Sequence, residues 1–135
     1  MDLWIQISPG SKEPVYIQVA EQISEAIAKG QLASGDKLPA VRKLAAELVI
    51  NPNTVARAYT HLEQAGLVTT KVGSGTFVAD PKMRKADAAD MNILTERMDT
   101  LISRGLNLGL KATKLIEIFK TRVEKFAINS NKKEE

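Results

Sequence analysis

The chain of 135 residues has no cysteine, a single histidine and no long apolar run. Without cysteine it can form neither a disulfide nor a thiolate zinc site. The histidine, His61, has no carboxylate four residues before or after it, so no metal site is expected there. No segment approaches the roughly 18 apolar residues that span a bilayer, and residues 1–10 lack the features of a signal peptide. These absences favour a cytoplasmic protein without metal, cofactor or membrane contact.

Strong charge of one sign is also lacking, because the formal net charge is only +3. A DNA-binding face, however, needs local rather than total basicity. Between residues 36 and 85, eight basic side chains accompany only four acidic ones. This region is therefore more positive than the whole chain, as contact with phosphates requires. Its basic residues are Lys37, Arg42, Lys43, Arg57, Lys71, Lys82, Arg84 and Lys85.

Hydrophobic periodicity divides the N-terminal part into short elements. Alternation over residues 3–7 predicts a strand, and helical spacing predicts helices over residues 15–29, 40–49 and 52–65. Two short strands are expected at 67–71 and 76–78, joined by a glycine-containing turn. A very short connection between the second and third helices, followed by a hairpin, is typical of a winged helix-turn-helix. We therefore predict a mostly α fold with a small β-wing over residues 1–80.

Residues 81–135 form a helical appendage in this interpretation, entered through a polar linker at 79–85. Gly105 is expected to end its first helix and Asn107 to cap the second, with a disordered tail from residue 129. Two short helices enclose little volume alone, so their apolar faces are expected to pair with a second copy. The predicted dimer contacts are Met91, Leu94, Met98, Leu101, Leu115, Ile116, Phe119, Val123 and Phe126.

The helix predicted over residues 52–65 has an apolar face and an opposite polar face on a helical wheel. Asparagine can pair with adenine, arginine with guanine, and a threonine methyl can touch a thymine methyl. The polar face has no acidic residue in its first two turns, so base reading explains it better than mere solvation. Its residues are Asn53, Thr54, Arg57, Thr60, His61 and Gln64.

Four motifs follow one another in this region: PAVRKLA at 39–45, NPNTVARAY at 51–59, LEQAGLV at 62–68 and GSGTFV at 73–78. Together they resemble the GntR family of bacterial transcription regulators, and the short C-terminal part resembles its YtrA subfamily. The resemblance implies a homodimer that binds a palindromic double-stranded operator and represses transcription. It also implies DNA contacts by Arg42, Asn51, Asn53, Thr54, Arg57 and Lys71 and by the wing turn of Gly73, Ser74 and Gly75.

Two positions depart from the family pattern. The family usually has serine where this chain has Ala40, so a helix cap and a phosphate contact are missing. Many members carry arginine where this chain has Ala56, and here the arginine is Arg57, about 100° further round the helix.

The alternative to DNA binding is a winged-helix module that docks proteins. No spacing of nucleophile and base supports an enzyme, and a small-molecule effector stays unassigned.

Overall fold

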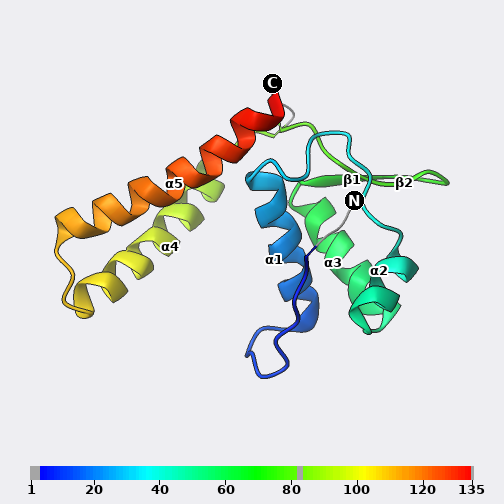
Figure 1. Ribbon diagram of the computed structural model, residues 1–135, viewed down its shortest axis with the longest axis horizontal. Helices are drawn as coiled ribbons and strands as arrows, with labels where there is room; N and C mark the ends of the chain where they lie inside the picture. Colours follow the sequence, from blue (N-terminus) through cyan, green and yellow to red (C-terminus); the bar gives the residue numbers. More distant parts are fainter. Residues whose placement is uncertain (1–3, 82–83, 135) are drawn as a thin grey trace.

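The computed structural model describes residues 4–81 and 84–134. In order, its elements are α1 (Val15–Ala28), α2 (Val41–Leu48), α3 (Pro52–Gln64), β1 (Val68–Lys71), β2 (Gly75–Val78), α4 (Ala88–Asn107) and α5 (Ala112–Glu134). Figure 1 shows the β1–β2 wing and the α4–α5 hairpin extending to opposite sides of helices α1 to α3. The predicted fold, mostly helical with a winged helix-turn-helix and a C-terminal helical hairpin, is confirmed.

Helices α1, α2 and α3 share one apolar core. Val19 and Ile23 of α1, Leu44 of α2, and Val55 and Leu62 of α3 are each at most 1% exposed. Each helix therefore buries one stripe of its surface, as the helical spacing of its apolar residues predicts. Buried residues from the connecting segment and the wing complete the core: Leu32, Leu38, Val68 and Val78.

The wing is tied to the helices by the segment that precedes α2. Strands β1 and β2 are antiparallel, with Val68 opposite Val78. The Leu38 amide donates to the Thr76 carbonyl (2.8 Å), and the Val78 amide donates to the Asp36 carbonyl (2.8 Å). The segment thus adds a third line of backbone along β2, which fixes the wing relative to α2 and α3.

Of the strand predicted at residues 3–7, Leu3 lies outside the described residues, and residues 4–7 form no strand. The backbone of this segment instead bonds to side chains of α1. The Gln22 side chain accepts from the Gln6 amide (2.9 Å) and donates to the Gln6 carbonyl (2.8 Å). Gln18, which is buried, accepts from the Ser8 amide (2.8 Å) and donates to its carbonyl (3.3 Å). Two side-chain amides thus take the place of a neighbouring strand, while alternate isoleucines pack on the core.

The reversal between α4 and α5 differs from the prediction. Gly105 does not end α4 but is buried within it, and the helix continues to Asn107. A Cβ at Gly105 would collide with the Leu115 side chain, so the glycine allows α4 and α5 to approach closely. The chain turns instead at Gly109, whose φ is +87°, and α5 begins at Ala112. Gly105 is therefore a packing residue and not a helix terminator.

The disordered tail expected from residue 129 is instead helical in its backbone as far as Glu134. No glycine or proline follows Gly109 in the sequence, so nothing forces α5 to end. The tail begins with Asn-Ser-Asn, and its last four residues are lysine and glutamate, which are good helix formers. Polarity alone therefore does not predict the helical backbone of this segment, and Glu135 lies outside the described residues.

The turn between α2 and α3 contains a strained residue. Val49 has φ 55° and ψ 51°, and it is the one non-glycine residue with positive φ in the described parts of the chain. The left-handed conformation costs an L-residue about 1–2 kcal/mol, and β-branching makes valine a poor choice for it. The strain is the cost of the tight turn that brings Asn51 to the start of α3.

Replacing Val49 with asparagine should raise the free energy of unfolding by about 1 kcal/mol, because asparagine tolerates the left-handed conformation. The matched control is Val72→Asn, since Val72 is also exposed (101%, against 88% for Val49) but has no positive φ. We expect the control to change stability by less than about 0.5 kcal/mol. Urea titrations of both variants make the comparison, and equal changes at the two positions would show that Val49 is unstrained.

Candidate nucleic-acid interface

Helix α3 begins as the sequence predicts. The Asn51 side-chain oxygen accepts a hydrogen bond from the Asn53 amide (2.8 Å), and Pro52 occupies the first helical position. This cap uses the oxygen of Asn51, so a DNA contact by the same residue, which stays a prediction, would fall to its amide nitrogen. At the start of α2, by contrast, Ala40 makes no side-chain cap.

The two faces predicted for α3 are present. Its buried residues are Val55, Ala58, Tyr59 and Leu62. Asn53 and Thr60 are exposed on the opposite side, and Thr54 at the edge is half-buried. No acidic residue lies in the first turn of the helix. An open polar surface is thus available for base contacts, although the individual contacts remain predictions.

Arg57 and His61 lie one turn apart on α3 and both approach Tyr16 of α1. The Arg57 guanidinium carbon lies 4.0 Å from the centroid of the Tyr16 ring. The His61 ring meets Tyr16 edge-on, with centroids 6.2 Å apart. Sequence reasoning missed Tyr16, because its place in the apolar stripe of α1 indicates only a core residue. The contact with Tyr16 shows that Arg57 is not an isolated side chain on the polar face of α3.

Two lysines flank the wing. The Lys71 ammonium lies 5.0 Å from the centroid of the Phe77 ring. Gly75 has φ +126°, and a Cβ there would meet the Lys37 side chain at 2.7 Å. Lys37 itself bridges to Phe77 through the backbone. The sequence marked Lys37 as one of several basic residues but did not place it at the wing, because that contact depends on the third line of backbone.

The remaining predicted contacts are open to solvent. Arg42 is exposed in the first turn of α2, and Ser74 is exposed in the wing turn. In that turn Gly73 has φ +80°, and the Ser74 amide donates to the Lys71 carbonyl (2.9 Å). Helix α2, helix α3 and the wing thus each present at least one predicted contact, and basic side chains lie on all three.

Two titratable side chains near α3, Tyr59 and Glu21, have a raised pKa. Burial, with a smaller effect of Glu47, raises the pKa of Tyr59, whose hydroxyl donates to the Pro39 carbonyl (2.7 Å). The protonated hydroxyl of Tyr59 therefore connects α3 to the segment before α2. Burial and the neighbouring Glu13 raise the pKa of Glu21 on α1, and the charge of Arg97 on α4 partly opposes this.

Chemistry of other kinds finds little support in the described parts of the chain. No three histidine, aspartate or glutamate side chains there are grouped as a metal ion would require. No described helix combines the length and apolar character needed to cross a membrane. The basic winged helix is therefore the feature around which a function can be built.

The α4–α5 hairpin carries the predicted dimer contacts. Leu101 and Ile116 are 66% and 68% exposed, and Met91, Leu94, Phe119 and Val123 are also exposed. Met98, Leu115 and Phe126 are half-buried, because Leu115 packs at Gly105 and the Phe126 ring lies under the Lys29 ammonium (5.2 Å). Sequence reasoning missed further exposed apolar residues on the hairpin: Ile93, Ile102, Leu106, Leu108 and Ile118.

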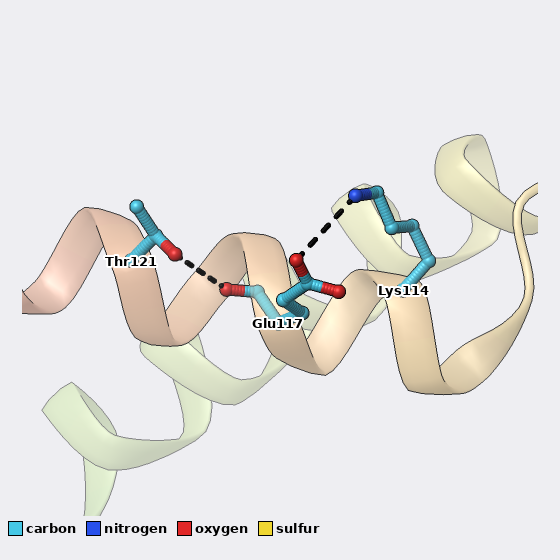
Figure 2. Close-up of polar contacts among 3 residues, drawn as sticks. All are labelled: Lys114, Glu117 and Thr121. Atoms are coloured by element: carbon cyan, nitrogen blue, oxygen red, sulfur yellow. Dashed lines mark hydrogen bonds and ion pairs between the residues drawn. The ribbon is translucent and has the colours of Figure 1, made fainter.

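Lys114, Glu117 and Thr121 of α5 make their polar contacts within the helix (Figure 2). Lys114 pairs with Glu117 (3.6 Å), and the Thr121 hydroxyl donates to the Glu117 carbonyl (3.0 Å). Such an exposed pair contributes little stability, but it shows which side of α5 suits water. The apolar side has no comparable partner within the described part of the chain, and so large an exposed apolar surface is typical of an interaction site.

Known proteins share both parts of this arrangement. Residues 15–78 match the family described as "Bacterial regulatory proteins, gntR family". The HTH-type transcriptional repressor YtrA of Bacillus subtilis is 38% identical over 86% of this chain and 89% of its own length. A structure described as a transcriptional antiterminator from Listeria monocytogenes has a TM-score of 0.79 at 26% identity over 90% of each chain. The AraR DNA-binding domain in complex with operator ORX1 has a TM-score of 0.50 at 33% identity, covering 55% of this chain and 92% of that one.

Proposed function

The chain belongs to the GntR family of bacterial regulatory proteins, and we propose that it is a homodimeric repressor that binds a palindromic operator in the bacterial cytoplasm. The observation that carries the proposal is the open, acid-free face of α3 between two other basic elements, α2 and the wing. The YtrA repressor shares 38% of its residues with this chain in the aligned region, and the AraR domain with the same fold binds an operator.

Each part of the winged helix has a distinct role in this proposal. Helix α3 enters the major groove, where Asn53, Thr54 and Arg57 meet base edges or phosphates. Arg42 of α2 and the wing lysines approach the phosphate backbone, which supplies affinity without sequence information. Lys37 joins Lys71 as a wing contact because both lie against the same two residues, Phe77 and Gly75.

The α4–α5 hairpin supplies the dimer. Its exposed apolar residues would be unfavourable in water on a monomer, and a second copy is a partner that is always present. A two-fold pair places two copies of α3 in successive major grooves about one helical turn apart, which requires an inverted-repeat operator. Two linked half-sites then bind far more tightly than either alone.

A winged-helix module that docks proteins is the alternative, and the polar face of α3, with no acidic residue in the first turn, disfavours it. Binding to the DNA upstream of the protein's own gene, measured by fluorescence anisotropy at several salt concentrations, separates the two functions. A DNA-binding protein should lose affinity linearly in log salt, by about 0.9 per neutralised phosphate. An affinity indifferent to salt between about 50 and 200 mM would contradict the proposal.

Removing a wing lysine tests the phosphate contacts directly. Lys71→Ala and Lys37→Ala should each reduce the slope of log K against log salt by about 0.9 and should weaken binding to all DNA sequences alike. Lys111→Ala is the matched control, because Lys111 lies in the connection between α4 and α5, and this hairpin and the wing extend to opposite sides of α1 to α3 (Figure 1). A slope that changes as much for Lys111 as for the wing lysines would show that total charge matters and position does not.

A further inference from the structure

The geometry points to Tyr16 as a positioning residue that holds the Arg57 guanidinium ready to donate hydrogen bonds to acceptors on DNA. The inference rests on the proposed function, since it concerns how the reading surface of α3 is prepared. Tyr16 belongs to the first turn of α1 and is half-buried. It therefore connects the recognition helix to a different element of the core.

The contact places the Arg57 guanidinium over the ring of Tyr16. With the Arg57 carbon 4.0 Å from the Tyr16 ring centroid, the cation lies over the ring, where the negative quadrupole face attracts it. The hydrogen-bond donors of a guanidinium lie in its plane. A guanidinium that lies over an aromatic ring and has no other bonded partner among the described residues can still donate to two oxygens or to the edge of guanine.

The donors of Arg57 have no other use within the described parts of the chain. The ion pairs found there join Lys29 to Glu25 and Lys114 to Glu117, and no described group accepts a hydrogen bond from the Arg57 side chain. Arginine is long and flexible, so an unrestrained side chain would lose much rotamer freedom on binding. The ring of Tyr16 removes part of that freedom beforehand, which is how preorganisation increases affinity.

His61 is a second residue of α3 whose side chain meets Tyr16. It lies one turn after Arg57 on α3 and meets the Tyr16 ring edge-on. The ring of Tyr16 thus contacts two residues of the recognition helix at once. Ala56, which precedes Arg57, is exposed and offers no hydrogen-bonding side chain. Arg57 is the single arginine of α3. Its orientation depends on a residue outside the helix, Tyr16.

The test measures the affinity of full-chain variants for two DNA duplexes of equal length. One carries the inverted repeat from upstream of the protein's own gene, and the other has a scrambled sequence. Tyr16→Phe keeps the ring and should bind the operator within about twofold of wild type. Tyr16→Leu removes the stack and should weaken operator binding about fivefold. In an Arg57→Ala background, Tyr16→Leu should have no further effect, because a positioning residue acts only through the side chain it positions.

Ile17→Ala is the matched control for packing, since Ile17 is the half-buried neighbour of Tyr16 on α1. Thermal unfolding should show that it loses stability while its ratio of operator to scrambled binding is unchanged. Arg57→Lys provides an arm that does not disturb the core, and it should weaken operator binding almost as much as Arg57→Ala, because lysine lacks the planar donor set.

Three results would overturn the inference: equal effects of Tyr16→Leu with and without Arg57, a loss in Tyr16→Phe as large as in Tyr16→Leu, or wild-type affinity in Arg57→Lys. Losses on the operator alone assign Arg57 to a base, and equal losses on both duplexes assign it to a phosphate. If the wild-type protein itself does not prefer the operator, the proposed function fails first, and that result is distinct from a failure of the coupling.

Discussion

Replacing Leu101 and Ile116 together with glutamate should dissociate the proposed dimer and weaken binding to an inverted repeat by about 100-fold. Both side chains are about two-thirds exposed on the α4–α5 hairpin, so glutamate can replace them without disturbing the core. In a dimer, however, each would place a charge in a desolvated apolar contact. Light scattering gives the oligomeric state, and anisotropy gives the affinities for the full repeat and for one half-site.

The control is Asn92→Glu, which adds a negative charge at an exposed polar position of α4. It should remain dimeric and should bind the inverted repeat nearly as tightly as the wild type. The double variant should bind a single half-site as the wild type does, because α3 and the wing are unchanged. A wild-type monomer that binds one half-site as tightly as the full repeat would refute the role proposed for the hairpin.

Leu62→Ala should lower the free energy of unfolding by about 2–5 kcal/mol, the cost of truncating a fully buried leucine. Leu62 is 1% exposed and anchors the apolar face of α3 in the core. That loss is a large share of the stability of a domain of this size. Guanidinium titration measures it, and DNA binding well below the unfolding temperature should be close to normal for the folded fraction.

Asn53→Ala on the opposite face of α3 should show the reverse pattern. Its side chain is exposed, so stability should change by less than about 0.5 kcal/mol. Operator binding should weaken by about 1–3 kcal/mol, with a smaller change on scrambled DNA, if Asn53 contacts a base. The pair of variants separates the two faces of one helix. A stability loss at Asn53, or intact stability at Leu62, would contradict the assignment of those faces.

The elements of the winged helix could be predicted because local chemistry determines them. Apolar residues at helical spacing, the cap at Asn51 and the glycines of the wing turn each act within a few residues of the chain. The same reasoning found the polar face of α3 without any partner in view. Periodicity therefore sufficed wherever an element faces one core and one solvent side.

Local patterns failed where the partner is distant in sequence. Alternation near the N-terminus reflects packing on the core, but glutamine side chains of α1 satisfy the backbone there. A glycine such as Gly105 is typical of a helix end, but here its missing side chain makes room for Leu115. Tyr16 and Lys37 join the candidate site only through contacts made after folding. No spacing rule within a single element could have found them.

The hairpin contacts the winged helix away from its linker as well. Phe126 of α5 lies under Lys29 at the end of α1, and Arg97 of α4 and Glu21 in the middle of α1 line the same cavity. In the proposed dimer, these contacts would affect the angle, and hence the separation, between the two copies of α3. The spacer length of the proposed operator would then depend on residues outside the proposed DNA-binding surface. Base preference and spacer preference could diverge independently among relatives, the first through α3 and the second through the surface between α1 and the hairpin.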